Sequence, residues 1–174
     1  MEIDKNKLEY RPLTKKDIPL RAKWIGDPDI NRFLGTRTRQ GLSAAFHEQW
    51  YQKYRKEKSK KIFIITYDGQ PIGQVGLTDI NLLDENAELY IVIGEKSFHG
   101  KGIGTLAVKW ICDYGFNKLD LHKIWLEVHA DNLGGIACYK KCGFVEEGRF
   151  KEQILVGDAY RDEVRMGLIK KQGA

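Results

Sequence analysis

The sequence predicts an α/β fold in which helices cover both faces of a mixed sheet of about seven strands. Between residues 87 and 128, a strand, a glycine-rich loop, a helix and a second strand follow one another, which is the order of a right-handed crossover between parallel strands. Two other pairs of apolar runs are each joined by a turn of Asp and Gly, which is typical of antiparallel hairpins. The length of 174 residues and the hydrophobic content of 42% suit one domain with one core, covering residues 1–174.

The chain opens with a predicted strand followed by two helices. Residues 8–13 alternate in polarity and predict the opening strand. Thr14 and Asp17 have the spacing of a capping box, so a helix is expected to begin there and to end at the Gly-Asp-Pro sequence downstream. After a loop over residues 35–42, Ser43 is expected to open a second helix of about four turns. The predicted buried face of this helix consists of Phe46, Trp50 and Tyr54.

Strands account for most of the remaining chain. Residues 61–67 and 71–79 predict a hairpin closed by Asp68-Gly69. Residues 87–94 predict a central strand, because both of its faces are largely apolar. After the glycine-rich loop and its helix, the expected elements are a strand over 124–128, a helix over 133–142, and a closing hairpin of 144–155 and 160–169.

The glycine-rich loop is His99-Gly100-Lys101-Gly102-Ile103-Gly104-Thr105. Glycines let backbone amides approach a ligand closely, and the first amides of a helix have no internal partner. The helix dipole and Lys101 add positive charge, so the loop is suited to bind phosphate. A nucleotide-triphosphate loop is excluded, because Gly102 stands where that motif needs Ser or Thr for magnesium. Residues 102–107 also fit a loose dinucleotide-binding pattern, which leaves a dinucleotide oxidoreductase as an alternative.

Glu88 is a candidate general base. A carboxylate in a strand that is covered on both faces is costly unless it is paired, solvated or protonated, and burial raises its pKa toward the useful range. The alternative is that Glu88 lies at the start of the strand and reaches solvent. Asp79, Asp84 and Glu85 precede it with no Lys or Arg among them. This indicates either an acidic region that attracts a cationic amine or a solvated hairpin loop.

Two motifs together resemble the GNAT acyl-CoA N-acetyltransferases. That family carries a loop of the form (Arg/Gln)-x-x-Gly-x-(Gly/Ala), and residues 99–104 match it with His at the first position. It also carries a tyrosine shortly before Gly-Phe, which Tyr139 and Gly143-Phe144 match. The layout of residues 148–168 resembles the RimJ/RimL-like branch, which modifies protein N-termini, polyamines, aminoglycosides and amino sugars. The resemblance implies a GNAT-like, mostly antiparallel sheet whose central pair of parallel strands splays apart around the pantetheine arm.

The resemblance also implies roles for individual residues. Acetyl-CoA is the expected co-substrate, and the expected acceptor is a primary amine of a small molecule or of a peptide such as a protein N-terminus. Tyr139 would protonate the departing thiolate, and Glu88 would take a proton from the amine. The residues expected to bind acetyl-CoA are Ile91, Val92, Ile93, His99, Gly100, Lys101, Gly102, Ile103, Gly104, Thr105, Asn132 and Tyr139. The residues expected to bind the acceptor are Asp29, Phe33, Trp50 and Glu88.

Some of these residues also have purely structural interpretations. Asn132 has the position of a helix N-cap, and Trp50 has the spacing of a core residue. For Tyr139 the structural alternative is a buried core aromatic residue. A non-catalytic acyl-CoA-binding domain would carry the same loop, so it is a second alternative to an enzyme.

Composition and charge argue against several other classes. The net charge of +5 is mild, and the basic run over residues 53–61 lacks an interleaved aromatic platform, so no nucleic-acid partner is expected. No apolar stretch approaches the roughly 20 residues of a membrane helix, and the acidic start is unlike a signal peptide, so a cytoplasmic location without a membrane partner is expected. Three cysteines without metal-ligand spacing predict reduced thiols and no metal site. An exposed edge strand is compatible with a homodimer.

Overall fold

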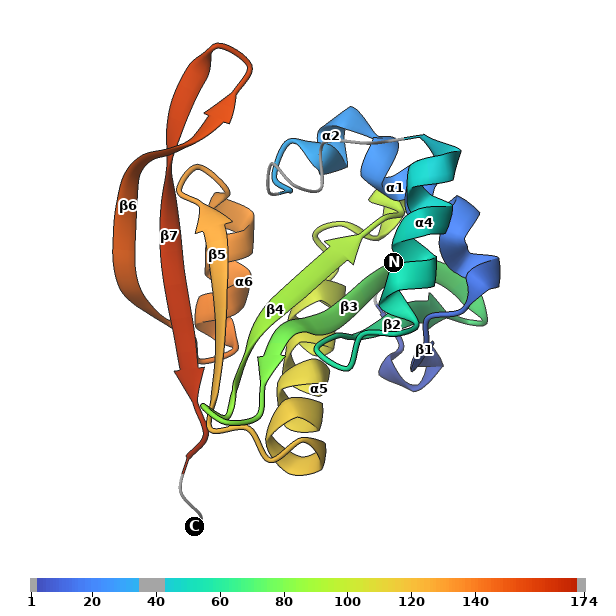
Figure 1. The fold of residues 1–174 in the computed structure, drawn as a ribbon, viewed down its shortest axis with the longest axis horizontal. Coiled ribbons are helices and arrows are strands. Elements are labelled where there is room, and N and C mark those ends of the chain that lie inside the picture. Colours follow the sequence, from blue (N-terminus) through green and yellow to red (C-terminus); the bar gives the residue numbers. More distant parts are fainter. Residues whose placement is uncertain (1–2, 35–42, 172–174) are drawn as a thin grey trace.

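The computed structural model describes residues 3–34 and 43–171, which form a sheet flanked by helices (Figure 1). Seven strands pair in the order β1-β2-β3-β4-β5-β7-β6. The strands are β1 (Leu8–Pro12), β2 (Lys61–Tyr67), β3 (Gln70–Asn81), β4 (Asn86–Ile93), β5 (Lys123–His129), β6 (Val145–Val156) and β7 (Ala159–Ile169). The helices are α1 (Ile18–Gly26), α2 (Pro28–Asn31), α4 (Ala44–Tyr54), α5 (Ile103–Lys118) and α6 (Leu133–Lys141), with short 3-10 helices η1 (Lys5–Lys7), η2 (Lys15–Asp17) and η3 (Lys96–Phe98).

The predicted fold class is confirmed. The neighbouring strands that the structure describes pair in antiparallel fashion except for β4 and β5, which are parallel. Local signals explain most of the boundaries. Asp68 and Gly69 adopt φ of 52° and 77°, as the tight turn between β2 and β3 requires, and Gly143 ends α6 at φ 94°.

The helix that follows Ser43 differs from its prediction. It ends at Tyr54, about one turn early, and the expected buried face of Phe46, Trp50 and Tyr54 is only partly buried. The buried residue of α4 is His47 instead, because its Nδ1 lies 3.0 Å from Nη1 of the buried Arg21 and accepts a hydrogen bond from it. The loop predicted over residues 35–42 lies outside the described residues.

Helices cover both faces of the sheet, and each face has its own apolar cluster. On one face, α5 packs through residues such as Ile111 onto Ile124 and Leu126 of β5. On the other face, Trp24 of α1 packs against Ile64 of β2 and Val92 of β4. The strand β4 therefore contributes to both clusters, which confirms that it is central. None of the described helices is long and apolar enough to span a membrane.

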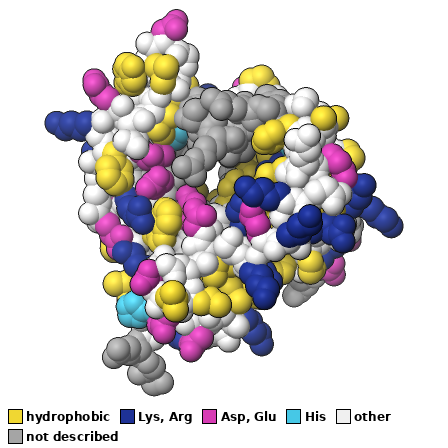
Figure 2. Space-filling model, in the orientation of Figure 1, with side chains coloured by type: hydrophobic (Ala, Val, Ile, Leu, Met, Phe, Trp, Pro, Cys, Tyr) yellow, Lys and Arg dark blue, Asp and Glu magenta, His cyan; other side chains and the backbone are white. Residues whose placement is uncertain are grey.

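The parallel pairing of β4 and β5 is short. It joins Asn86 to Lys123, Ala87 to Ile124 and Glu88 to Trp125, and then it stops. Beyond this point β4 stays paired with β3 and β5 stays paired with β7, so the two halves of the sheet diverge (Figure 1). Where the two halves diverge, the space-filling view shows a hollow, which we call the cleft (Figure 2).

The structure generates a test of how the first helix is anchored. The buried Asp17 carboxylate accepts hydrogen bonds from both Arg11 Nη atoms, at 2.6 and 2.8 Å, and from the Thr14 amide at 2.8 Å. Burial alone would raise the pKa of Asp17, but these bonds outweigh it and lower the pKa below its usual value. Asp17→Asn leaves Arg11 without its charge partner. We therefore expect the free energy of unfolding, measured with urea, to fall by about 3 kcal/mol.

The matched control is Asp68→Asn, which removes the exposed ion pair between Asp68 and Lys7. That change should lower the free energy of unfolding by less than about 1 kcal/mol. Since the pKa of Asp17 is depressed in the folded state, its contribution is present above the unfolded pKa and is lost as the pH falls through the folded pKa. Equal losses in the two variants would contradict this account.

Candidate active site

The cleft between β4 and β5 has a backbone edge on one wall. From Leu89 to Ile93, β4 has no strand partner among the described residues on the side that faces β5. The His99 Nε2 atom lies 2.8 Å from the Ile93 carbonyl oxygen and must donate to it, because a carbonyl only accepts. Backbone groups alternate between the two edges of a strand, so the amide of Ile91 faces the same open edge as the Ile93 carbonyl. This edge can hydrogen-bond an extended polar chain.

The glycine-rich loop lies at the end of this edge and opens α5. Gly100 and Gly102 adopt φ of 71° and 80°, where a side chain would be strained, and nothing lies within 4 Å of a Cβ built on either. Gly104 is different, because a Cβ there would meet only Cys138 Sγ at 3.5 Å, an ordinary contact. The protein itself therefore has room for a side chain at Gly104, and the free space above the loop is available to a ligand.

The same loop provides the donors for an anion. Gly102 is the N-cap of α5 and has no side chain to cap the first amides, which have no intrahelical acceptor. The Lys101 ammonium lies 5.4 Å from the centre of the Phe98 ring and adds positive charge to the loop. These features fit the pyrophosphate of a coenzyme A derivative. His99 is turned away from the amides, toward Ile93.

The helix α6 borders the cleft on the β5 side. Asn132 caps it by accepting a hydrogen bond from the Gly135 amide at 3.0 Å, so its predicted structural role is confirmed. Tyr139 lies in the last turn and its ring packs against Phe144, with 6.1 Å between ring centres. No hydrogen bond joins the Tyr139 hydroxyl to another residue in the described part of the chain. Burial raises the pKa of Tyr139 above its usual value, so the hydroxyl stays protonated at neutral pH.

Glu88 lies where the two parallel strands separate. Its carboxylate accepts a hydrogen bond of 3.1 Å from the Thr78 hydroxyl. Burial raises the pKa of Glu88 above its usual value, the Thr78 bond opposes this, and the charges of Asp79 and Glu127 raise it further. The remaining residues of the predicted acidic region, Asp84 and Glu85, belong to the turn between β3 and β4.

The residues predicted to bind the acceptor have different surroundings in the structure. The ring of Phe33 meets the ring of His129 edge-on, with 6.2 Å between centres, so Phe33 lies against the end of β5. Asp29 is exposed and forms an ion pair with Lys96. Trp50 packs in the second apolar cluster, stacked on Tyr54 with 5.3 Å between ring centres.

The sequence reasoning missed a group of charged residues on β5 and β7. Glu127 faces Arg165 across the two strands, and His129 faces Glu163. Burial, followed by the charges of Glu127 and Glu88, raises the pKa of Glu163 to about 7. The alternation of polar and apolar residues along β7 was the available signal, but it does not reveal which residues of β5 they oppose. Figure 2 shows a hollow in the middle of this face with acidic side chains gathered on its left side.

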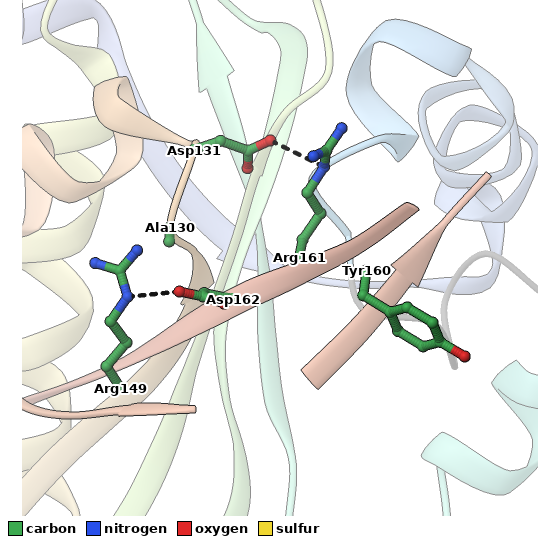
Figure 3. Close-up of a pocket in the computed structure, with 6 residues that line it drawn as sticks. All are labelled: Ala130, Asp131, Arg149, Tyr160, Arg161 and Asp162. Carbon is green, nitrogen blue, oxygen red and sulfur yellow. Dashed lines mark hydrogen bonds and ion pairs between the residues drawn. The ribbon is translucent and has the colours of Figure 1, made fainter. Parts of the chain in front are cut away.

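A separate hollow of about 300 Å³ lies at the outer end of β5 (Figure 3). Its charged side chains are already matched, since Arg149 pairs with Asp162 at 2.8 Å and Arg161 approaches Asp131 at 3.9 Å. None of the residues predicted to bind the cofactor lines it. Among the described residues, no group of His, Cys, Asp and Glu side chains is arranged to hold a metal ion.

Comparisons with known proteins agree with this geometry. A family model described as an acetyltransferase (GNAT) domain matches residues 7–145. The spermidine N(1)-acetyltransferase of Escherichia coli strain K12 is 31% identical over 167 residues, which cover 95% of this chain and 87% of that protein. A crystal structure of spermidine N-acetyltransferase from Vibrio cholerae in complex with CoA and spermine has a TM-score of 0.86 at 28% identity, covering 94% of this chain and 96% of that one. A dodecameric structure of spermidine N-acetyltransferase from Vibrio cholerae in an intermediate state has a TM-score of 0.83 at 29% identity, covering 94% of each chain.

Gly104 provides a test of the loop as an anion cradle. Gly104→Ala places a methyl group in space that the protein leaves open, where it would crowd a bound pyrophosphate. We expect calorimetry to show an affinity for coenzyme A that is lower by about tenfold or more. The free energy of unfolding should rise slightly, by up to about 1 kcal/mol, because alanine favours a helix more than glycine does.

The control is Gly148→Ala on β6, outside the loop, where a Cβ meets nothing within 4 Å. Coenzyme A should bind this variant as it binds the wild type. Unchanged binding in Gly104→Ala would show that the ligand does not approach the loop closely.

Proposed function

This chain belongs to the GNAT acetyltransferase family, and we propose that it transfers the acetyl group of acetyl-CoA to a primary amine of a polyamine. The observation that carries the proposal is the cleft between β4 and β5. At one end of the cleft lie the first amides of α5, which no side chain caps. At the other end, carboxylates lie around the point where β4 and β5 separate. A phosphate-bearing donor and a cationic acceptor therefore fit opposite ends of one cleft.

In this proposal, acetyl-CoA lies along the open edge of β4. The amides of residues 102–105 hold its pyrophosphate, with Lys101 as an additional cation. Ile91 and Ile93 provide the open backbone groups for the pantetheine arm, and Asn132 meets the arm from α6. Val92 lies between them, with its backbone groups toward β3. The His99 side chain holds the loop to β4.

The chain's own residues then perform the transfer. Glu88, directly or through one water, takes a proton from the substrate ammonium, so that the neutral amine can attack the thioester carbonyl. The amide of Ile91 on the open edge donates to the carbonyl oxygen as negative charge develops on it. The new C–N bond forms as the C–S bond breaks, and Tyr139 donates its proton to the departing sulfur.

Transfer is direct, without an acetylated cysteine. Burial raises the pKa of Cys142 to about 11 and that of Cys112 to about 12, so neither is an activated thiolate at neutral pH. Cys138 contacts the Thr105 hydroxyl at 3.4 Å and belongs to the contact between α5 and α6.

A polyamine is favoured over an amino sugar with a single amine or a protein N-terminus as acceptor. The relatives described above are spermidine acetyltransferases, and the carboxylates around Glu88 favour a substrate with several positive charges. Modification of a protein N-terminus, as in the RimJ/RimL-like branch, is the second candidate, because the end of the cleft beside Phe33 and His129 carries aromatic side chains.

Three further proposals concern the protein as a whole. The domain extends over residues 1–174, because β6 and β7 join the same sheet beyond residue 145, where the family match ends. The protein acts in the cytoplasm. It also forms a homo-oligomer, for which the dodecameric relative and the exposed edge strand β6 give support.

The proposed function is tested by acetyl transfer from labelled acetyl-CoA to a panel of amines, with products identified by mass spectrometry. Spermidine should be acetylated with a higher kcat/KM than an amino sugar with a single amine or a peptide. Binding of acetyl-CoA without transfer to any amine would indicate a non-catalytic domain, and modification of peptides alone would indicate an N-terminal acetyltransferase.

Tyr139→Phe should lower kcat by about a hundredfold or more, because the leaving thiolate loses its proton donor. The affinity for coenzyme A should change little, since only the hydroxyl is removed. Steady-state kinetics and calorimetry measure the two effects. Tyr114→Phe, which removes a hydroxyl from α5 outside the cleft, is the control and should retain full activity. A Tyr139→Phe enzyme as fast as this control would exclude Tyr139 as the acid.

Glu88→Gln should lower kcat and alter the dependence of the rate on pH. The raised pKa of Glu88 means that the wild-type rate increases with pH as the carboxyl ionises, in a range above the ordinary value for glutamate. The glutamine variant should lose this acidic limb. Glu85→Gln in the β3–β4 turn removes the same charge outside the cleft and should keep the wild-type profile. Retention of the acidic limb in Glu88→Gln would assign it to another group.

A further inference from the structure

The face of the sheet that carries Glu88 also carries an acidic wall formed by β5 and β7. Residues directly opposite each other in neighbouring strands lie on the same face. Trp125 is level with Glu88, and Glu127 and His129 follow it on that face of β5. Glu163 of β7 lies opposite His129, so it is on this face as well. The opposite face of β7 carries Val164 and Met166, which belong to the apolar core.

The charges on this wall do not balance. Arg165 lies on the same face of β7, and its Nη1 donates to Glu127 at 3.1 Å while the guanidinium lies 3.9 Å from the centre of the Trp125 ring. The neighbouring arginines of the hairpin pair with aspartates rather than with Glu163. No ion pair reaches Glu163 within the described residues. Among the residues that the structure describes, Glu163 is therefore a partly buried carboxylate without a cationic partner.

The surroundings of Glu163 are suited to the methylene chain of an amine. Phe150 of β6 lies opposite Glu163 and is 40% exposed, so an aromatic side chain borders the carboxylate on that side. A bulge in β6 follows Phe150, and Asp162 fixes it by accepting hydrogen bonds from the Glu152 amide at 3.0 Å and from Arg149 Nε at 2.8 Å. A cation that lies next to an aromatic ring and a carboxylate is stabilised by both.

The position of Glu163 relative to Glu88 indicates what kind of amine can use both. Along β5, Trp125 is level with Glu88 and His129 is level with Glu163. These four residues of strand correspond to about 13 Å. A linear polyamine can place one amine at Glu88 and another toward Glu163, whereas a monoamine reaches only one of them.

We propose that Glu163 determines specificity: with Glu127, it holds a non-reacting ammonium group of the polyamine while the reacting amine lies at Glu88. This inference rests on the proposed function. The pKa of Glu163 is raised to about 7 by burial and by the charges of Glu127 and Glu88. This is consistent with a site that binds a cation, because a bound ammonium group would offset these effects.

The experiment compares Glu163→Gln with the wild type, using spermidine and propylamine as acceptors. For spermidine, the KM should rise by about tenfold while kcat changes by less than about twofold. For propylamine, kcat/KM should not change, because a monoamine has no second ammonium group. Glu146→Gln is the matched control, since Glu146 lies opposite Met166 and so loses the same charge from the other face of the sheet.

A second measurement separates the proposed contact from a structural effect. Calorimetry of spermidine binding at pH 7, in buffers that differ in ionisation enthalpy, should show proton release in the wild type as Glu163 ionises, and less release in Glu163→Gln. The groups that face Glu163 are Glu88 on β4, Glu127 and His129 on β5, and Arg165 on its own strand. They are unchanged in the variant, so the difference in proton release belongs to Glu163.

The outcomes distinguish this inference from the proposed function. A wild-type enzyme that acetylates no polyamine overturns both. A wild-type enzyme that acetylates spermidine, together with a Glu163→Gln enzyme whose KM and proton release match those of Glu146→Gln, overturns the inference alone. Equal losses on spermidine and propylamine would show that Glu163 supports the fold of the cleft, and would also overturn it.

Discussion

The structure depends on the short pairing between β4 and β5. Backbone N–H and C=O groups must find partners, and a strand in the middle of a sheet normally finds them on both sides. After Glu88 and Trp125, β4 loses its partner on one side although it remains covered above and below by apolar clusters. Among the described residues, the fold itself thus leaves this edge of β4 unpaired. The glycine-rich loop and α6 are placed where a ligand along this edge would meet them.

Packing in the two halves of the sheet keeps β4 and β5 apart. On the α1 side, Gly94 ends β4 directly under Trp24, and a Cβ at Gly94 would lie only 2.2 Å from that ring. The Trp24 indole donates to Glu95 at 2.8 Å, so the end of β4 is fixed to α1. On the other side, β5 is held in full register by β7 over its whole length. Packing therefore fixes β4 to one half of the sheet and β5 to the other. Closure of the cleft would break contacts in both halves.

Sequence reasoning succeeded where the cause is local and failed where it is a long-range register. The turn at Asp68-Gly69, the cap at Gly143 and the glycine-rich loop that opens α5 each follow from a few consecutive residues. The pairing of Asp29 with Lys96 and of Arg21 with His47 joins elements far apart in the chain, so periodicity could not show that these polar groups satisfy one another. In the same way, the pattern of β7 marks which residues share a face but not which residues of β5 they oppose.

The position of the acidic groups follows from the same division of the sheet. A carboxylate inside a strand has a desolvation cost that is tolerated only near water or a cation. Glu88 lies at the first position where β4 borders the cleft, and Glu127 and Glu163 lie on strands that face it from the other half. The cleft thus brings together charges that a continuous sheet would bury without compensation. Burial and then the charges of Glu127 and Glu88 raise the pKa of Glu163, while burial with the charges of Asp79 and Glu127 raises the pKa of Glu88. A cation beside these groups would lower both pKa values. The gathering of carboxylates on this face and the raised pKa values of Glu88 and Glu163 therefore have one physical origin, the position of these groups where the strands part.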